Sequence, residues 1–112
     1  MDKSIITIKQ AHSIENVISK SRFIAYIKPV STENEAKAFI DEIKTKHKDA
    51  THNCSAYTVG PEMNIQKAND DGEPSGTAGI PMLEILKKQE IHNVCVVVTR
   101  YFGGIKLGAG GL

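Results

Sequence analysis

The fold of this chain is decided by one stretch in its C-terminal part, Asn93-Val94-Cys95-Val96-Val97-Val98-Thr99-Arg100-Tyr101. β-Branched residues dominate this stretch, which favours a strand over a helix because side chains branched at Cβ pack well on a pleated surface. Apolar residues occupy both of its alternating faces, a pattern typical of strands that are covered on both sides. The sequence therefore predicts a central strand here, with the other elements built around it.

Two amphipathic helices are predicted to pack on the resulting sheet. The first follows Thr32, whose hydroxyl can accept a hydrogen bond from a first-turn amide while Glu35 reaches back, as in a capping box. Behind this cap, residues that form one helical face recur at helical spacing: Ala36, Phe39, Ile40, Ile43 and His47. The second helix is predicted from about Ile80, with Pro81 in its first turn. Its apolar face is predicted to consist of Met82, Leu83, Ile85 and Leu86.

Further strands are predicted on both sides of the first helix. Three precede it, at residues 4–9, 15–20 and 23–30, and the last two can form a hairpin. One more is predicted at residues 53–59, followed by a polar loop over residues 60–79. Irregular loops of such length are usually functional or disordered. The order of elements predicts a single α+β domain over residues 1–112, a two-layer βα sandwich with its helices packed on one mixed sheet.

The composition is that of a globular domain without a strong overall charge. The 112 residues carry a formal net charge of +1, with 40% hydrophobic and 24% charged residues. A core can therefore form, and binding to a polyanion would need a local patch. No apolar run is long enough to span a membrane, and the N-terminus lacks the apolar region of a signal peptide. Cys54 and Cys95 are expected to be reduced, buried thiols of a cytoplasmic protein, since a disulfide between them would need an oxidising compartment.

The first segment with functional character precedes the second helix and reads Asp70-Asp71-Gly72-Glu73-Pro74-Ser75-Gly76-Thr77-Ala78-Gly79. Exposed amides at a helix N-terminus, together with the hydroxyls of Ser75 and Thr77, can hold an anion. The segment lacks the lysine of a P-loop and the glycine spacing of a dinucleotide-binding motif. The alternative is a structural turn in which Gly76 and Gly79 adopt unusual dihedral angles and Thr77 caps the helix.

The second segment continues the central strand and reads Thr99-Arg100-Tyr101-Phe102-Gly103-Gly104-Ile105-Lys106-Leu107-Gly108. Arg100 and Lys106 offer cations to a phosphate or carboxylate, and Tyr101 and Phe102 can stack on a base. The alternative pairs Arg100 with an acidic side chain of the first segment, puts Tyr101 at the edge of the sheet and buries Phe102 in the core. Of these three residues, only Phe102 is predicted to follow the alternative.

Metal binding and catalysis have less support in the sequence. The acidic residues Asp70, Asp71 and Glu73 do not follow the spacing of an EF-hand loop. His52 and Cys54 share one face of a predicted strand, but a zinc site needs three or four protein ligands. No motif brings a serine, a histidine and an aspartate together. We therefore expect no metal or cofactor, assign no catalytic residue and interpret the chain as a binding domain rather than an enzyme.

Taken together, the two segments resemble the IMPACT family, also called UPF0029. The resemblance is carried by residues 71–79, 97–104 and 106–108, and it extends to residues 21–25 and 50–54. It implies a fold similar to the second domain of a small-subunit ribosomal protein. Because members of the family usually continue past this point, the resemblance also leads us to expect a domain that is truncated at its C-terminal end.

The resemblance further implies a role in translation. We expect binding to RNA, to the ribosome or to a translation-associated protein. The candidate binding residues are Glu73, Ser75, Gly76, Thr77, Gly79, Arg100, Tyr101, Gly103, Gly104 and Lys106. The alternative is an enzyme that acts on a phosphorylated small molecule or nucleotide, by analogy with kinases that share this fold.

Overall fold

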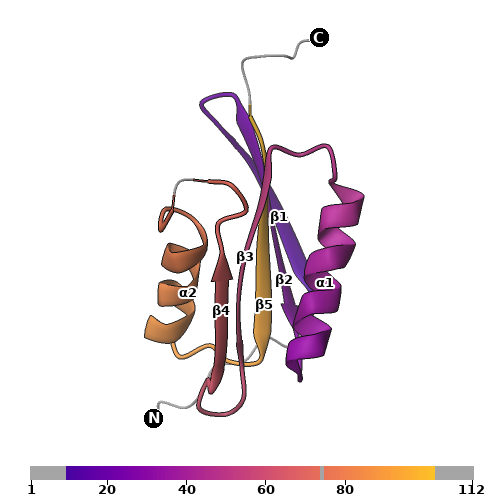
Figure 1. The fold of residues 1–112 in the computed structure, drawn as a ribbon. Coiled ribbons are helices and arrows are strands. Elements are labelled where there is room, and N and C mark those ends of the chain that lie inside the picture. Colours follow the sequence, from indigo (N-terminus) through magenta and orange to yellow (C-terminus); the bar gives the residue numbers. More distant parts are fainter. Residues whose placement is uncertain (1–9, 74, 103–112) are drawn as a thin grey trace.

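Strand β5 (Val94–Tyr101) lies in the middle of a five-stranded sheet whose order is β1-β2-β5-β3-β4. The computed structural model describes residues 10–73 and 75–102 of the chain. The other strands are β1 (His12–Ile18), β2 (Ser21–Pro29), β3 (His52–Val59) and β4 (Ile65–Asn69). Figure 1 shows this sheet between two helices, α1 (Glu33–Lys46) and α2 (Gly79–Lys88). The predicted central strand at residues 93–101 is therefore confirmed.

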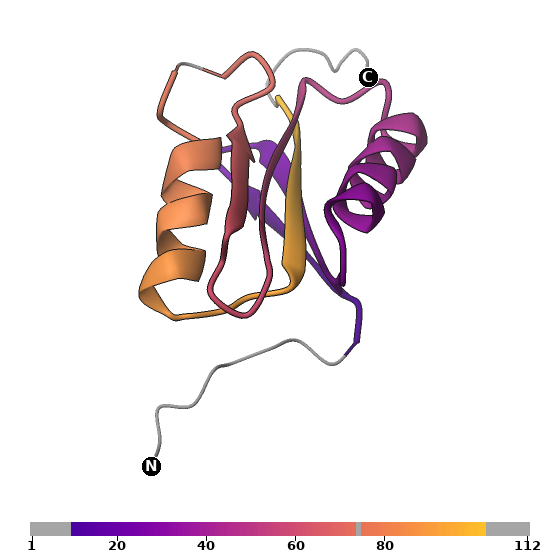
Figure 2. The ribbon, with the colours of Figure 1, turned by 60° about the horizontal axis from the view of Figure 1, so that its bottom comes forward.

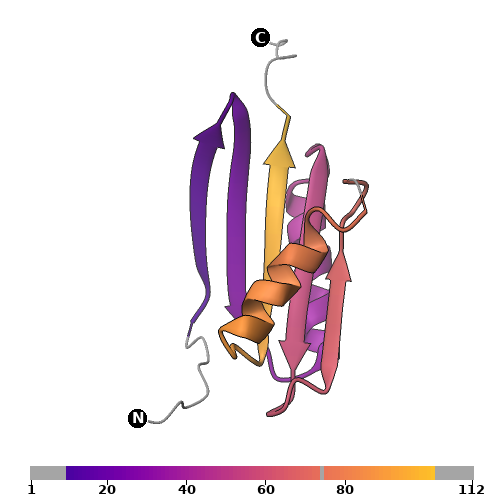
Figure 3. The same cartoon turned by 90° about the vertical axis from the view of Figure 1, so that its left-hand side faces the viewer.

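The two helices cover opposite faces of the sheet, as Figures 2 and 3 show. Successive residues of β5 point to opposite faces, so Cys95 and Val97 pack in the cluster under α1, whereas Val94 packs under α2. The α1 cluster adds Phe39 and Ile43, and the α2 cluster adds leucines of its own helix. The alternation explains why β5 is apolar on both faces.

Every neighbouring pair of strands in the sheet is antiparallel, so the predicted mixed sheet is wrong. Each helix does connect two strands of the same direction, but another strand lies between them. α1 joins β2 to β3 across β5, and α2 joins β4 to β5 across β3. The predicted two-layer arrangement is also wrong, because the helices form layers on both sides of the sheet. The crossover β2-α1-β3 and the crossover β4-α2-β5 run in opposite directions along the sheet, between strands of opposite direction. Two crossovers of the same hand would therefore place both helices on the same face. Because the helices lie on opposite faces, the two crossovers have opposite hands.

The Thr32 cap predicted for the first helix is present, and Glu35 reaches back as expected, but to the residue before the cap rather than to Thr32 itself. The Glu35 amide donates to Thr32 Oγ1 at 3.1 Å, and Glu35 Oε1 accepts from the amide of Ser31 at 2.6 Å. The predicted helical face is confirmed as well, because Ala36, Phe39 and Ile43 are buried against the sheet. Local sequence signals thus fixed where α1 starts and which side it buries.

A hydrogen-bonded chain of side chains ties the end of α1 to the sheet. His47 Nε2 lies 2.6 Å from the Tyr26 hydroxyl, and His47 Nδ1 lies 2.7 Å from the Tyr101 hydroxyl, which donates to Asp49 at 3.0 Å. Since Tyr101 donates onward, its oxygen accepts from Nδ1–H, and Tyr26 donates to the free lone pair of Nε2. Burial is the main cause that lowers the pKa of His47, and nearby Lys46 and Arg22 add to it. His47 is therefore a neutral, buried link between β2, α1 and β5.

Some predicted elements are placed differently in the structure. The strand predicted at residues 15–20 is β1, which ends at Ile18 because Ser19 and Lys20 form a hairpin turn with φ of 51° and 70°. Part of the loop predicted at residues 60–79 is strand β4, paired with β3. The strand predicted at residues 4–9 lies outside the described residues.

The two cysteines are free and buried, as predicted. Cys54 lies beside the α2 face and Cys95 under α1, so the sheet separates their thiols. None of the helices in the described residues combines the length and the hydrophobicity that spanning a bilayer requires.

Candidate functional site

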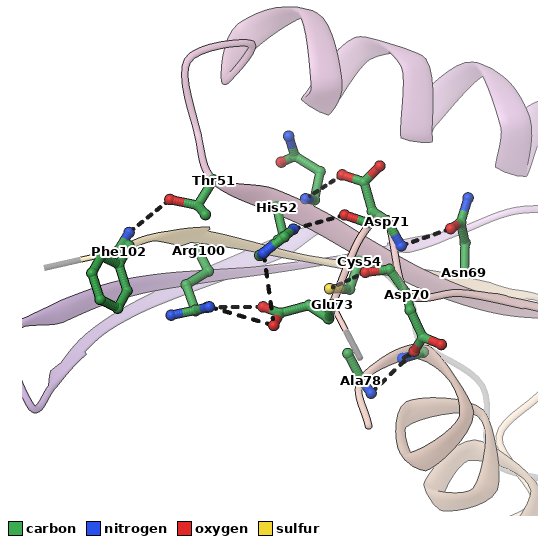
Figure 4. A network of polar contacts seen from close by, with 12 residues as sticks. Thr51, His52, Cys54, Asn69, Asp70, Asp71, Glu73, Ala78, Arg100 and Phe102 are labelled. Atoms are coloured by element: carbon green, nitrogen blue, oxygen red, sulfur yellow. Dashed lines mark hydrogen bonds and ion pairs between the residues drawn. The ribbon is translucent and has the colours of Figure 1, made fainter. Parts of the chain in front are cut away.

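The two segments singled out in the sequence meet through an ion pair. Arg100 Nε lies 2.8 Å from Glu73 Oε2, and Arg100 Nη2 lies 3.4 Å from Glu73 Oε1, so the contact is bidentate (Figure 4). Both side chains are mostly buried, with 21% and 15% of their surface exposed. His52 Nε2 lies 3.8 Å from Glu73 Oε1 on the other side. The end of β5 and the loop before α2 therefore form one polar cluster.

Strand β3 holds the loop of the first segment in place. His52 Nδ1 is 2.7 Å from the carbonyl oxygen of Asp71, and the amide of Asn53 donates to Asp71 Oδ2 at 2.6 Å. Cys54 Sγ donates to the carbonyl oxygen of Asp70 at 3.2 Å. Three successive residues of β3 thus bind two successive residues of the loop, which fixes the position of Glu73 beside Arg100.

The amides at the start of α2 bind a carboxylate of the chain itself. Asp70 accepts from the amides of Gly76 at 2.8 Å, Ala78 at 3.1 Å and Gly79 at 2.7 Å. These hydrogen bonds, led by those from Gly76 and Gly79, lower the pKa of Asp70. The donors that the sequence offered to an external anion are therefore engaged by Asp70 in this structure.

The structural alternative for this turn is correct only in part. Gly76 has a φ of +79°, as that alternative supposes. Gly79 is instead required for a close approach, since a Cβ on it would lie 2.6 Å from the amide nitrogen of Asn69. The N-cap residue is Ala78 rather than Thr77, so this part of the alternative is wrong. Asp70 has taken over that role from outside the helix.

Asp70→Asn is expected to loosen the start of α2 without unfolding the sheet. An amide side chain carries no charge to balance the helix dipole and presents one acceptor oxygen where the carboxylate presents two. Hydrogen exchange measured by NMR should become faster at the amides of Gly76, Ala78 and Gly79 and stay unchanged at Val97 in β5. In the unsubstituted chain the same loosening should occur as the pH falls below about 4 and through the lowered pKa of Asp70, because the stabilisation requires its ionised form. Unchanged exchange at these amides in the variant would contradict the prediction.

A groove opens beside the polar cluster, on the face of the sheet that α2 covers only in part. Its volume is about 450 Å³. Residues from β2, β3, β5, α2 and the loop before α2 line it: Phe23, Cys54, Glu73, Thr77, Ala78, Pro81, Met82, Ile85, Val98 and Arg100. Ile85, predicted to belong to the buried face of the second helix, is 60% exposed at its edge. On the apolar face of α2, Leu83 and Leu86 are buried and Met82 is partly buried.

The thiol in this groove is poorly suited to act as a nucleophile. Burial, followed by the carboxylate of Glu73, raises the pKa of Cys54 to about 11. The thiol therefore stays protonated near neutral pH and donates to Asp70, as described above. In the described part of the chain, no group of three histidine, cysteine, aspartate or glutamate side chains is arranged to hold a metal ion.

The structure separates the remaining candidate residues. Ser75, Gly76 and Thr77 lie in the exposed turn before α2. Tyr101 lies on the opposite face of the sheet from Arg100 and contacts His47, so it does not join the cluster. Phe102 is 54% exposed, and its predicted place in the core is wrong. Gly103, Gly104 and Lys106 lie outside the described residues.

Several residues that build the site are not among the predicted binding residues: Asp70, Asn53 and Phe23. The alternation in residues 52–54 offered one signal, since polar side chains on both faces of a strand next to a central one need polar partners. Arg100 is predicted from the sequence to offer its charge to a ligand rather than to pair with an acidic side chain of the first segment. This prediction is wrong, because Arg100 pairs with Glu73.

The chain is similar to proteins of a known family. Residues 19–112 match the Impact N-terminal domain. The chain is 65% identical to the IMPACT family member YvyE of Bacillus subtilis, covering 97% of this chain and 50% of YvyE. It is 44% identical to the IMPACT family member YigZ of Escherichia coli, covering 85% of this chain and 48% of YigZ.

A solved structure of the two-domain translational regulator Yih1 matches the chain with a TM-score of 0.64 and 34% identity, over 82% of this chain and 36% of Yih1. The chain thus spans about half the length of YvyE and YigZ. The match covers both segments that form the polar cluster, and the predicted resemblance is confirmed: the chain belongs to the IMPACT family through its N-terminal domain.

Proposed function

We propose that this chain is a regulatory binding domain that acts in translation, and that its partner binds where the Glu73–Arg100 pair joins the two segments. The partner is RNA, the ribosome or a translation-associated protein. The observation that carries the proposal is the pair itself, because it brings two segments 27 residues apart to the edge of one groove. The similarity to Yih1, a two-domain translational regulator, supports the link to translation.

The chemistry of the site distinguishes these partners. Arg100 has five N–H donors, and two of its nitrogens already bind Glu73, so only part of the guanidinium can reach a phosphate. The groove beside it presents Phe23, Val98 and Ile85. Apolar walls with a charged pair at one end are typical of protein recognition. A translation-associated protein is therefore favoured over bare RNA.

Two substitutions test the proposal, and the expectations for a protein partner and for RNA are opposite at Glu73. Co-sedimentation with ribosomes is measured at low and moderate salt for Arg100→Gln and Glu73→Gln. If the partner is a protein, each substitution should lower the binding affinity by about tenfold, because either change leaves one charge of the pair without its partner. An RNA contact should weaken with Arg100→Gln and strengthen with Glu73→Gln, which frees the guanidinium. For RNA, Arg100→Gln should also reduce the slope of log affinity against log salt by about 0.7.

Lys88→Gln provides the matched control. It removes one positive charge from the exposed end of α2, away from the groove lining. Its retention on ribosomes should equal that of the unsubstituted chain. If the Arg100 and Glu73 variants also behave like Lys88→Gln, no partner binds at the pair and the proposal is wrong.

The alternative of an enzyme that acts on a phosphorylated small molecule or nucleotide finds less support at this site. Asp70 already binds the amides at the start of α2, and the Cys54 thiol is protonated near neutral pH. Isothermal titration with ATP and magnesium tests it directly. Heat of binding at millimolar nucleotide that Arg100→Gln abolishes would favour the enzyme over the binding domain.

A further inference from the structure

A second hollow lies on the other face of the sheet, between α1 and the strands β3 and β4. Its volume is about 240 Å³, and its lining consists of Lys37, Ile40, Asp41, Lys44, Ser55, Tyr57, Lys67, Ala68 and Asn69. The register of β3 and β4 places Ser55 opposite Asn69 and Tyr57 opposite Lys67. The hollow is therefore built by two cross-strand pairs below and by one side of α1 above.

Three lysines gather around this hollow. Lys37 and Lys44 are two turns apart on α1, and Lys67 reaches in from β4. Among the described residues, neither Lys37 nor Lys67 forms an ion pair, and Lys44 has only a long contact of 3.8 Å between Nζ and Asp71 Oδ1. One carboxylate, that of Asp41, belongs to the lining. The lining therefore carries an excess of positive charge.

The lining of the hollow includes the hydroxyl of Ser55. The residue is only 3% exposed, and no hydrogen bond of its side chain is found among the described residues, in which no fully buried side-chain oxygen lacks a partner. The hydroxyl is therefore open to the hollow and can bind a group that enters it. Next to Ser55, the side-chain oxygen of Asn69 accepts from the amide of Asp71 at 2.8 Å, which leaves the Asn69 amide group as a donor.

We propose that this hollow binds a phosphate group. Three lysines, one hydroxyl and one side-chain amide belong to its lining, and phosphate oxygens are the acceptors that such donors match. The hydroxyl of Tyr57, which also belongs to the lining, is not available to a ligand, because it already donates to Glu33 at 2.5 Å. The volume suits a phosphate with a small part of its carrier, which is either a phosphorylated small molecule or a nucleotide unit of RNA.

This phosphate site goes beyond the function proposed above and does not rest on it, since it lies on the opposite face of the sheet from Arg100. The two sites are nevertheless linked through Asp71. Its Oδ1 faces Lys44, its Oδ2 accepts from the amide of Asn53, and its carbonyl oxygen contacts His52. A phosphate that drew Lys44 away would leave Asp71 less constrained, next to the loop that carries Glu73.

NMR titration of the full ¹⁵N-labelled chain with inorganic phosphate at constant ionic strength tests the site. The amides of Ser55 and Asn69 should shift saturably with phosphate and not with chloride. Lys37→Gln/Lys67→Gln should weaken binding by at least about tenfold, and Ser55→Ala by about fivefold, because each removes donors to a charged acceptor. The matched control Lys87→Gln/Lys88→Gln removes the same charge from α2 and should leave the affinity unchanged.

Two further ligands identify the carrier. Adenosine monophosphate that binds more tightly than phosphate alone indicates a phosphorylated small molecule, and a short oligouridine that does so indicates RNA. The lysines are exposed or half-exposed, so the spectra of the variants should keep their dispersion. The proposal is overturned if no probe shifts Ser55 and Asn69 saturably, or if Lys37→Gln/Lys67→Gln binds phosphate as tightly as its control. Ribosome binding of the Arg100 and Glu73 variants is a separate readout, so either proposal can fail alone.

Discussion

Gly79→Ala is expected to destabilise the fold by roughly 3 kcal/mol, because the first residue of α2 packs directly on the backbone of β4. A Cβ on Gly79 would lie 2.6 Å from the amide nitrogen of Asn69 and 2.8 Å from its carbonyl carbon and oxygen. These are backbone atoms, which cannot turn aside as the end of a flexible side chain could. The whole helix would have to move away from the sheet, which would open the core around Leu83. Urea unfolding followed by circular dichroism measures the loss.

Gly76→Ala is the control for this prediction. Gly76 has a φ of +79°, but a Cβ there would meet nothing within 4 Å. Its cost should be only that of a left-handed residue other than glycine, about 1 kcal/mol. A loss with Gly79→Ala no larger than with Gly76→Ala would show that α2 does not approach β4 this closely.

His47→Ala is expected to cost a similar amount, roughly 3 kcal/mol of unfolding free energy. The substitution leaves a cavity at the end of α1 and removes the hydrogen-bond partner of two half-buried hydroxyls, those of Tyr26 and Tyr101. Stranded polar groups and lost packing both add to the loss. Tyr26→Phe removes only one of these hydrogen bonds and keeps the ring, so it should cost about 1 kcal/mol.

The same histidine should make stability depend on pH. Burial holds the pKa of His47 below its ordinary value of 6.5, so below pH 6.5 the unfolded chain binds a proton that the folded chain does not. The unfolding free energy should therefore be constant with respect to this group above pH 6.5 and fall as the pH drops into the window below it. His47→Ala should remove this part of the pH dependence. A variant that loses stability over the same window as strongly as the unsubstituted chain would contradict the assignment.

The parts of the fold that local chemistry determines could be predicted from the sequence. The valine-rich stretch at residues 93–101 has only one good solution, a strand with both faces covered. Thr32 and Glu35 specify a helix start through contacts only three residues apart, and the structure contains that start. The family resemblance also followed from short motifs, because residues 97–104 are adjacent in the chain.

The parts that depend on distant contacts could not be predicted. Strand β4 consists of polar or small residues apart from Ile65, so its pairing with β3 leaves no local pattern. Phe102 is of a residue type common in cores, but it follows the last residue of β5 and its side chain is exposed. The choice of Glu73 for Arg100, and of Asp70 for the start of α2, depends on a loop conformation that His52, Asn53 and Cys54 impose from another strand.

The place of β5 in the sheet has a consequence for how the chain folds during its synthesis. The hairpins β1–β2 and β3–β4 share no strand pairing, and only β5, the last strand of the described chain, hydrogen-bonds to both. Until Val94–Tyr101 has left the ribosome, the two hairpins have no strand pairing that joins them. Each hairpin is too small to be stable alone. Both core clusters include residues of β5, so neither is complete before this strand emerges. A nascent chain paused before Val94 should therefore bind chaperones, and one paused well beyond Tyr101 should not.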